Sequence, residues 1–461
     1  MRRFIGREKE LSILEDIWSR DGIGTCAVYG RRQIGKSTLL DRFSEGKRTL
    51  KMQFSRSSPY ENLVRMRFDL SEFLNRDIPE LDSMTEAMLM IADACRMERT
   101  LLILDEFPYL EEDFPQTSSI LQRLIDVDLR GTDTMVVICG SSISSMRSMT
   151  EDMSSPLYGR FTDRLKVGPL SFPECRKFHP DMDPMDTLRL YMTLGGVPKY
   201  HEMADRDSYE GCIRECFIDR IRDLSAEGAS MITNELSPGS HYTSIVSCIA
   251  DGSVKQSVIA DKLGIDRGDC KRRLDRLESI DLVGRRSPML NAPAQPSYAI
   301  LDPMVDFHYS VLRRHENVLN GPASSDMKYE DIRQDIATFL GRRFEAICGE
   351  WLDRNMEVKR RGTWWGRVNG EDVDIDIVAT VYDGPSRTRT VLAECKFRNR
   401  PMGFDALNSL EERAKAAHAD ENMSFVLFSG SGFTERLSEY AEDHDVMLVG
   451  PEELLTGLDG S

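Results

Sequence analysis

A motif near the amino terminus constrains the fold of this chain more than any other feature. It is the complete pattern G-x-x-x-x-G-K-[ST], and it lies between an apolar run at 25–29 and a helix-like segment from 38 to 43. A glycine-rich loop between a buried strand and a helix lets backbone amides converge on phosphates, and the helix N-terminus adds partial positive charge. A glycine-rich turn that matches by chance is the alternative. The residues predicted to bind the nucleotide are Gly30, Arg31, Arg32, Gln33, Ile34, Gly35, Lys36, Ser37 and Thr38.

Four side chains have the chemistry that hydrolysis of a bound ATP requires. Lys36 is expected to reach the β- and γ-phosphates, and Ser37 to hold Mg²⁺. The apolar run 101–104 predicts a central parallel strand covered on both faces, and this run ends in Asp105 and Glu106. Ligands bind at the carboxyl ends of such strands, so Asp105 is predicted to bind Mg²⁺ and Glu106 to polarise the attacking water. The alternative is a strand that simply ends in solvated acids.

Three further features of this region are open to two interpretations each. A strand predicted at 135–139 leads into Ser141 and Ser142, either of which could bond the γ-phosphate or the lytic water, or merely form a turn. Arg160 is a candidate arginine finger or an ordinary surface arginine. The segment 4–6 either starts a helix that packs on the core or lies against the adenine.

Length and charge limit what the rest of the chain can be. With 461 residues the chain is expected to form two to four domains. Its net charge of −17 argues against a protein with a generally basic surface, so any nucleic-acid contact must be local. Ten scattered cysteines predict reduced core residues. The sequence shows no apolar signal region and no run long enough to span a membrane, so a cytoplasmic location is expected.

The middle of the chain predicts a helix-turn-helix with a wing. Helices are expected at 242–250 and 255–263, and a third from about 266 to 280, followed by short strands at 282–286 and 297–300 with a proline-rich turn between them as the tip. The third helix carries five basic residues interleaved with four acids. It could therefore meet DNA phosphates, or it could be a solvated face with internal ion pairs, or the unit could bind protein. A linker is expected at 317–326.

The last third contains a second set of acids. The alternating run 373–379 predicts a strand with Asp374 and Asp376 on one face, and the next strand, 391–397, places Glu394 and Lys396 on one face. Asp376 and Glu394 are predicted to bind Mg²⁺, and Lys396 to orient water or stabilise charge in phosphodiester hydrolysis. An ion pair in an inactive fold is the alternative. Further strands are expected at 425–429 and 446–449, separated by helices.

Both ends of the chain resemble one known family. The segments 4–8, 30–37, 101–106, 139–142, 157–160 and 194–200 are similar to those of the archaeal-type ATPases, among the AAA+ and STAND-like P-loop ATPases and near the origin-recognition ATPases. The resemblance implies that the segment 194–200 lies in a helical lid. The acidic strands resemble the restriction-endonuclease-type fold and the C-terminal domain of that same family, although Asp374 stands where the family usually has a glutamate.

Together these features predict an α/β protein with four parts. They are a P-loop ATPase core at 1–170, a helical lid at 171–236, a winged helix-turn-helix at 237–315 and a restriction-endonuclease-like domain at 327–461. The predicted function is Mg²⁺-dependent ATP hydrolysis coupled to DNA binding or cleavage. The rival is a nucleotide-dependent scaffold or signalling switch whose nuclease-like domain is inactive and binds a partner. The sequence predicts no oligomeric state.

Overall fold

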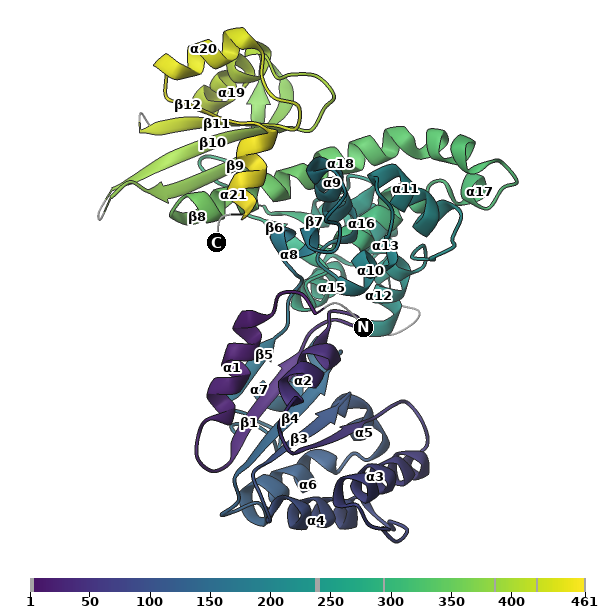
Figure 1. Ribbon diagram of the computed structural model, residues 1–461. Helices are drawn as coiled ribbons and strands as arrows, with labels where there is room; N and C mark the ends of the chain where they lie inside the picture. The colour runs from purple at the N-terminus through teal and green to yellow at the C-terminus, as the bar shows by residue number, and fades with distance from the viewer. Residues whose placement is uncertain (1–3, 237–240, 293–294, 385–386, 420–421, 460–461) are drawn as a thin grey trace. The chain divides into compact units, whose positions relative to one another are not determined.

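The computed structural model describes residues 4–236, 241–292, 295–384, 387–419 and 422–459. The chain divides into two compact units, one made of residues 1–170 with 197–199 and the other of residues 171–196 with 200–461. Figure 1 labels the elements of both units. No helix within the described ranges is both long enough and apolar enough to cross a membrane.

The first unit is built on a parallel sheet of five strands in the order β2-β3-β4-β1-β5. The strands are β1 Gly24–Tyr29, β2 Thr49–Gln53, β3 Thr100–Asp105, β4 Thr134–Gly140 and β5 Asp163–Lys166. Every residue of β1, β3 and β4 is buried, which explains why their sequences are apolar runs without alternation. Burying one such aliphatic side chain contributes about 1.5–3 kcal/mol, so these strands fix the centre of the unit.

Seven helices accompany this sheet in the described residues of the first unit. They are α1 Glu8–Trp18, α2 Lys36–Ser44, α3 Pro59–Leu74, α4 Met84–Cys95, α5 Phe107–Asp113, α6 Thr117–Arg123 and α7 Ile143–Glu151, with a π-helical turn at Leu124–Asp128. The helices α3, α4 and α6 lie together and share one apolar core with the sheet (Figure 1). The parallel order puts all the strand-to-helix turns at one edge of the sheet, where ligands bind in open α/β folds.

The second unit begins with short helices. They are α8 Phe172–Arg176, α9 Pro184–Leu194, α10 Pro198–Met203, α11 Tyr209–Ile213 and α12 Glu227–Glu235, with a π-helical turn at Arg214–Ile218. Next come α13 Tyr242–Ala250, α14 Gln256–Leu263 and α15 Arg267–Ser279, then the antiparallel hairpin of β6 Val283–Arg286 and β7 Ser297–Ile300. These bounds confirm the predicted helices and strands of the middle region. Pro293 and Ala294, in the turn predicted as a tip, lie outside the described residues.

The predicted linker is shorter than the sequence suggested. After α16 Pro303–Phe307 and a π-helical turn at His308–Leu312, the segment 317–326 contains most of α17 Glu316–Leu319 and the start of α18 Ser325–Asn355. Ser324 caps α18 by accepting a hydrogen bond from the amide of Met327. A serine N-cap is a helix-start signal, and this explains why a polar stretch begins a helix of 31 residues.

The last part of the second unit is a mixed five-stranded sheet in the order β12-β11-β10-β9-β8. Its strands are β8 Val358–Val368, β9 Glu371–Tyr382, β10 Thr388–Lys396, β11 Met423–Ser429 and β12 Val446–Val449. The helices α19 Phe404–Ala416 and α20 Glu435–Asp443 lie on one side of the sheet, and α18 and α21 Pro451–Asp459 on the other (Figure 1). This confirms the predicted strands, while β8, with its two tryptophans, was not predicted as a strand.

Candidate nucleotide site and C-terminal acidic site

The predicted phosphate loop follows β1 and runs directly into α2. Gly35 has φ of 94°, a conformation that favours glycine, and a side chain on Gly30 would collide with the carbonyl oxygen of Val167. Lys36 is buried, and its Nζ donates hydrogen bonds to the carbonyl oxygens of Gly30 (2.8 Å) and Arg31 (2.9 Å). The loop therefore holds the lysine amine over its own backbone, where a phosphate chain would lie.

Two oxygen ligands suited to Mg²⁺ meet beside this loop. The hydroxyl of Ser37 donates to Oδ2 of Asp105 at 2.8 Å, and Asp105 is fully buried at the end of β3. Nζ of Lys51, on the neighbouring strand β2, lies 3.9 Å from the same carboxylate oxygen. A hydroxyl and a carboxylate at hydrogen-bond distance fit a magnesium ion, which prefers oxygen ligands. The structure thus brings Ser37 and Asp105 together although 67 residues of chain separate them.

The predicted base and the predicted serine also meet. Glu106 has φ of 56°, a left-handed conformation that is uncommon for glutamate and concentrates at functional sites. The Ser141 hydroxyl lies 2.6 Å from both carboxylate oxygens of Glu106, and the Ser141 amide donates to Oε2 at 3.2 Å. Ser142 has a different role, because its hydroxyl caps α7 by accepting from the amide of Ser145. Ser141 is therefore the serine that positions Glu106.

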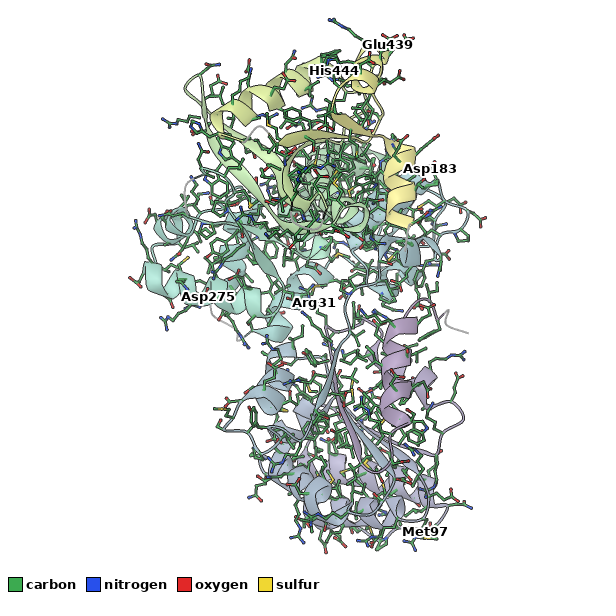
Figure 2. The ribbon with its side chains drawn as sticks, turned by 90° about the vertical axis from the view of Figure 1, so that its left-hand side faces the viewer. Arg31, Met97, Asp183, Asp275, Glu439 and His444 are labelled. Atoms are coloured by element: carbon green, nitrogen blue, oxygen red, sulfur yellow. The ribbon has the colours of Figure 1, made fainter. Side chains whose placement is uncertain are left out.

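Arg160 lies at the other edge of the sheet, away from the loop. Its carbonyl oxygen accepts from Thr25 at the beginning of β1, and its guanidinium lies 3.2 Å from Asp126. Figure 2 shows the two ends of this unit, with Arg31 of the loop at one and Met97, just before β3, at the other. Within one chain Arg160 is thus a surface arginine paired with an acid. In the structure its guanidinium therefore has Asp126 as its partner.

Arg7 and Pro198 lie at the loop, a position that the sequence pattern does not reveal. Arg7 is only 6% exposed, and its guanidinium donates to the carbonyl oxygens of Ile34 (3.0 Å) and Gly168 (2.7 Å) while it pairs with Glu10 (2.8 Å). It ties the phosphate loop to the segment after β5. Pro198 lies 3.8 Å from where a Cβ on Gly35 would be, so this part of the predicted lid segment belongs to the first unit.

The acids of the C-terminal sheet converge as predicted from strand alternation. Oδ2 of Asp376 accepts a hydrogen bond from the amide of Cys395 at 2.8 Å. Nζ of Lys396 forms an ion pair with Oε1 of Glu394 and lies 4.0 Å from Oδ2 of Asp376. Burial, then the charges of Glu394 and Glu345, raise the pKa of Asp376 well above its ordinary value. For Lys396, burial lowers the pKa, but the two neighbouring carboxylates more than offset this effect.

Each of these carboxylates already has cationic partners. Oε2 of Glu394 lies 2.7 Å from Arg413 of α19, in a pair whose side chains are 4% and 9% exposed. Arg413 is itself fixed by the carbonyl oxygens of Asp374 (2.6 Å) and Ser409 (3.0 Å). Removing one partner of such a buried pair costs roughly 3–5 kcal/mol. Both oxygens of Glu394 therefore face a positive charge.

These residues fit a metal ion only in part. Among the described residues no group of three or more His, Cys, Asp or Glu side chains is arranged to hold a metal. Asp376 and Glu394 would be the ligands of a metal ion. At Glu394 the ion would compete with the cations of Lys396 and Arg413. Glu345, whose charge also acts on Asp376, pairs with Arg286 at 3.1 Å.

The N-terminal part of the chain is similar to ATPase and ATP-binding proteins. Residues 4–203 match a family described as an ATPase domain predominantly from Archaea. An uncharacterized ATP-binding protein of Methanocaldococcus jannaschii is 38% identical over 45 residues, which are 10% of this chain and 76% of that protein. A Walker-type ATPase of Pyrococcus abyssi has a similar fold, with a TM-score of 0.53 and 16% identity over 67% of this chain and 96% of that one.

The likeness extends beyond the nucleotide domain. Residues 308–415 match a family described as archaeal and bacterial proteins of unknown function. An uncharacterized protein of M. jannaschii is 26% identical over 382 residues, which cover 81% of this chain and 83% of that protein. Residues 4–203 are thus similar to an ATPase domain found mainly in Archaea, and residues 308–415 are similar to a region of archaeal and bacterial proteins of unknown function.

Proposed function

We propose that this protein is a Mg²⁺-dependent ATPase of the AAA+/STAND-like class whose nucleotide state controls nucleic-acid binding by its second unit. One observation carries the first half of this proposal: Ser37, Asp105, Glu106 and Ser141 form two hydrogen-bonded pairs at the carboxyl edge of one parallel sheet. ATP hydrolysis needs ligands for a cation and a group that orients the attacking water, and the two pairs supply these.

Each residue of the site has one role in this proposal. Lys36 and the loop amides bind the phosphates, and Ser37 and Asp105 hold Mg²⁺. Bound Mg²⁺ would supply the positive charge that neutralises phosphate oxygens. Glu106 accepts a proton from the attacking water, and the Ser141 hydroxyl keeps its carboxylate oriented.

The second unit supplies the parts that would respond to the nucleotide. In this proposal residues 171–236 are a lid, and α13, α14, α15 and the β6–β7 hairpin are a winged helix. The order of three helices and an antiparallel hairpin, with a shared apolar core, supports this interpretation. The C-terminal sheet would be a restriction-endonuclease-like fold, supported by the convergence of Asp376, Glu394 and Lys396.

Metal-dependent cleavage of nucleic acid is the second candidate function. The position of Lys396 between two acids favours it, because a lysine there can stabilise charge on a phosphodiester. The ion pair between Glu394 and Arg413 favours binding without cleavage. A nucleotide-dependent switch that binds a partner remains the alternative if both activities are absent.

The deciding experiment measures ATP hydrolysis by the purified protein with and without DNA. If nucleotide state and DNA binding are coupled, DNA should change the rate of ATP hydrolysis. Lys36→Ala should abolish hydrolysis both with and without DNA. The same samples with Mg²⁺ or Mn²⁺ are tested for nicked DNA, with Asp376→Ala as the matched variant. Nicking that Asp376→Ala stops would establish cleavage, whereas intact DNA in all metals would leave binding alone. An ATPase rate that no nucleic acid changes would refute the coupling.

A further inference from the structure

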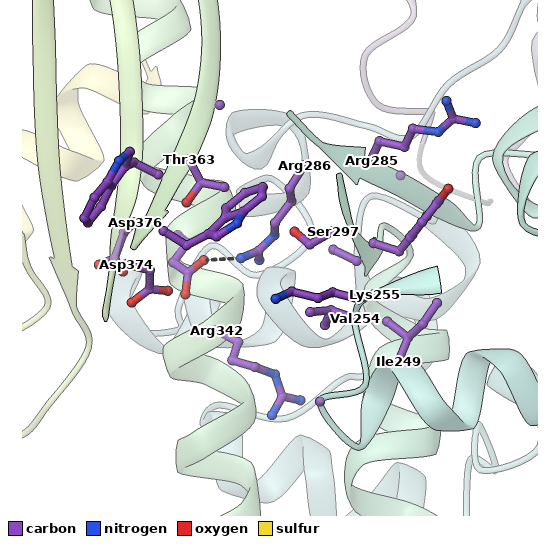
Figure 3. A pocket seen from close by; sticks show the side chains of 18 of the residues that line it. Ile249, Val254, Lys255, Arg285, Arg286, Ser297, Arg342, Thr363, Asp374 and Asp376 are labelled. Atoms are coloured by element: carbon purple, nitrogen blue, oxygen red, sulfur yellow. Dashed lines mark ion pairs between the residues drawn. The ribbon is translucent and has the colours of Figure 1, made fainter. Parts of the chain in front are cut away.

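A cleft within the second unit separates the β6–β7 hairpin from the C-terminal sheet. Its volume is about 1230 Å³, and its walls come from α13, the hairpin, α18, β8 and β9 (Figure 3). Sites for drug-sized ligands are roughly 300–1,000 Å³. The cleft is therefore large enough for a segment of a polymer. It leads to Asp374 and Asp376, which line it.

The walls of this cleft differ in charge from the chain as a whole. Eight basic and six acidic side chains line it, an excess of positive charge in a protein of net charge −17. Figure 3 shows Lys255, Arg286 and Arg342 around the cavity; Arg286 pairs with Glu345 and Arg342 with Asp306 at 3.4 Å, and the charge of Lys255 acts on Asp372. Trp365 is half-buried in the lining and lies opposite Asp374 in the β8–β9 register. Basic groups beside an aromatic ring are the features by which proteins hold single-stranded nucleic acid.

Strand alternation divides the two arginines of β6 between two surfaces. Arg285 points toward α15 and pairs with Asp275 (2.5 Å) and Glu278 (2.7 Å). Arg286 points into the cleft and pairs with Glu345 of α18 at 3.1 Å (Figure 3). Successive side chains of a strand face opposite ways, so Arg285 borders the cleft but turns its guanidinium away, whereas the guanidinium of Arg286 enters the cleft.

The helix that would enter a DNA groove is largely neutralised by its own acids. On α15, Arg272 and Arg273 pair with Asp269 at 3.0 and 2.8 Å, and Lys271 pairs with Asp275 at 2.8 Å. Exposed pairs of this kind contribute little to stability, but they cancel the field that a phosphate would meet. The exposed face of α15 is thus a poor site for a polyanion.

The segment after β6 is held in place by the C-terminal sheet. The amide of Met289 donates to the carbonyl of Thr363 (2.9 Å), and the amide of Thr363 donates to Ser287 (3.1 Å), which adds a short parallel segment beside β8. Met289 is buried in the core of the sheet domain, and the Trp364 indole donates to Asn291 at 2.7 Å. This segment is a fixed wall of the cleft, so it is not free to enter a groove of duplex DNA.

We propose that this cleft binds single-stranded nucleic acid, with phosphates on Lys255, Arg286 and Arg342 and a base against Trp365. The inference rests on the proposed function, because it names the form of nucleic acid and the surface that receives it. When a phosphate binds to Arg286, it replaces the Glu345 carboxylate as the partner of this guanidinium. Asp374 and Asp376 at the end of the cleft repel phosphates, so the nucleic acid is expected to bind along the basic wall.

The test is fluorescence anisotropy with a fluorescein-labelled oligo(dT) and a duplex of equal length, in EDTA over a series of salt concentrations. The wild type should bind the single strand more tightly than the duplex. Lys255→Glu should weaken single-strand binding and lower the slope of log K against log salt by about 0.7. Trp365→Ala should weaken it about fivefold or more, as the loss of one stacked base predicts. Arg272→Glu on α15, whose side chain is 79% exposed, makes the same type of charge change and should leave binding unaltered.

Two outcomes would overturn the inference. In the first, Arg272→Glu weakens binding and Lys255→Glu does not, which places the nucleic acid on α15. In the second, the wild type binds the duplex as tightly as the single strand, or binds neither. Thermal unfolding of each variant reports on the folding of the second unit, and ATP hydrolysis reports on the first unit. Because the binding assay needs no ATP, a protein without ATPase activity would refute the proposed function and leave the cleft inference to be decided by the anisotropy.

Discussion

The hydroxyl of Ser37 lies 2.8 Å from Oδ2 of Asp105 and donates a hydrogen bond to it, which joins the start of α2 to the end of β3. Both oxygens lie beside the phosphate loop, in an arrangement that a cation between protein and phosphates requires. This pair shows that functional side chains from distant parts of the chain meet at one edge of the parallel sheet.

Replacing Ser37 by alanine should weaken the response of the ATPase to Mg²⁺. The variant loses one predicted ligand and leaves the buried Asp105 without its hydroxyl donor. We expect the Mg²⁺ concentration for half-maximal hydrolysis to rise about 10–100-fold. Ser37→Thr keeps the hydroxyl and should restore the response, and Ser44→Ala at the exposed end of α2 is the control. An unchanged Mg²⁺ dependence in Ser37→Ala would contradict the assignment.

Replacing Ser141 by alanine should slow hydrolysis without weakening ATP binding. Ser141 acts through Glu106, so its loss should lower kcat by about 10–100-fold, less than the 10²–10⁴-fold that loss of a general base can cause. Ser142→Ala removes the cap of α7 and should cost about 1 kcal/mol of stability with kcat retained. Steady-state kinetics and thermal unfolding of both variants separate the two roles. A KM effect in place of a kcat effect would mean that Ser141 binds the nucleotide itself.

Replacing Arg7 by alanine should loosen the phosphate loop. The variant loses charge-assisted hydrogen bonds to Ile34 and Gly168, each contributing roughly 1.5–3 kcal/mol. We expect weaker binding of a non-hydrolysable ATP analogue and a lower unfolding temperature, both measured by thermal shift. Lys9→Ala, which removes an exposed cation nearby, is the control. If Arg7→Ala bound the analogue as tightly as wild type, the loop would not depend on this anchor.

The stability of the second unit should depend on pH through Asp376. Its pKa is raised in the folded state, so the folded protein holds a proton that the unfolded chain releases, and this carboxyl's contribution to stability falls as pH rises from about 4 toward neutrality. Asp376→Asn should therefore raise the unfolding temperature at pH 8 and have little effect at pH 4. Asp372→Asn, an exposed acid of the same strand whose pKa is lowered by Arg367, should not stabilise at pH 8. Calorimetry at pH 4 and pH 8 measures the unfolding temperature of each variant. If Asp376→Asn changed that temperature equally at both pH values, the raised pKa of Asp376 would be contradicted.

The sequence was informative wherever function depends on order along parallel strands. Asp105, Glu106 and Ser141 were expected near the loop because the carboxyl ends of parallel strands share one sheet edge. For Arg160 the sequence left two interpretations open, because nothing in its own segment shows that Asp126 is its partner. Arg7 acts on backbone carbonyls far along the chain, and these leave no pattern in the side chains.

The same limit applies to the second unit. Alternation in 373–379 was enough to place Asp374 and Asp376 on one face. The partners of the acids, Arg413 and Arg286, come from a helix and a hairpin whose packing is set by tertiary contacts. The wall of the cleft after β6 is joined to β8 by backbone hydrogen bonds between Met289 and Thr363. Any sequence can form such bonds, so the pattern of apolar residues does not predict the cleft.

The most direct test of the central claim is a single-turnover measurement with radiolabelled ATP and Mg²⁺. The wild type and Glu106→Gln should bind ATP with similar affinity, but only the wild type should release phosphate at a measurable rate. Lys36→Ala should bind no ATP. If Glu106→Gln hydrolysed bound ATP as fast as the wild type, the assignment of Glu106 and of the site built around Ser37 and Asp105 would be wrong.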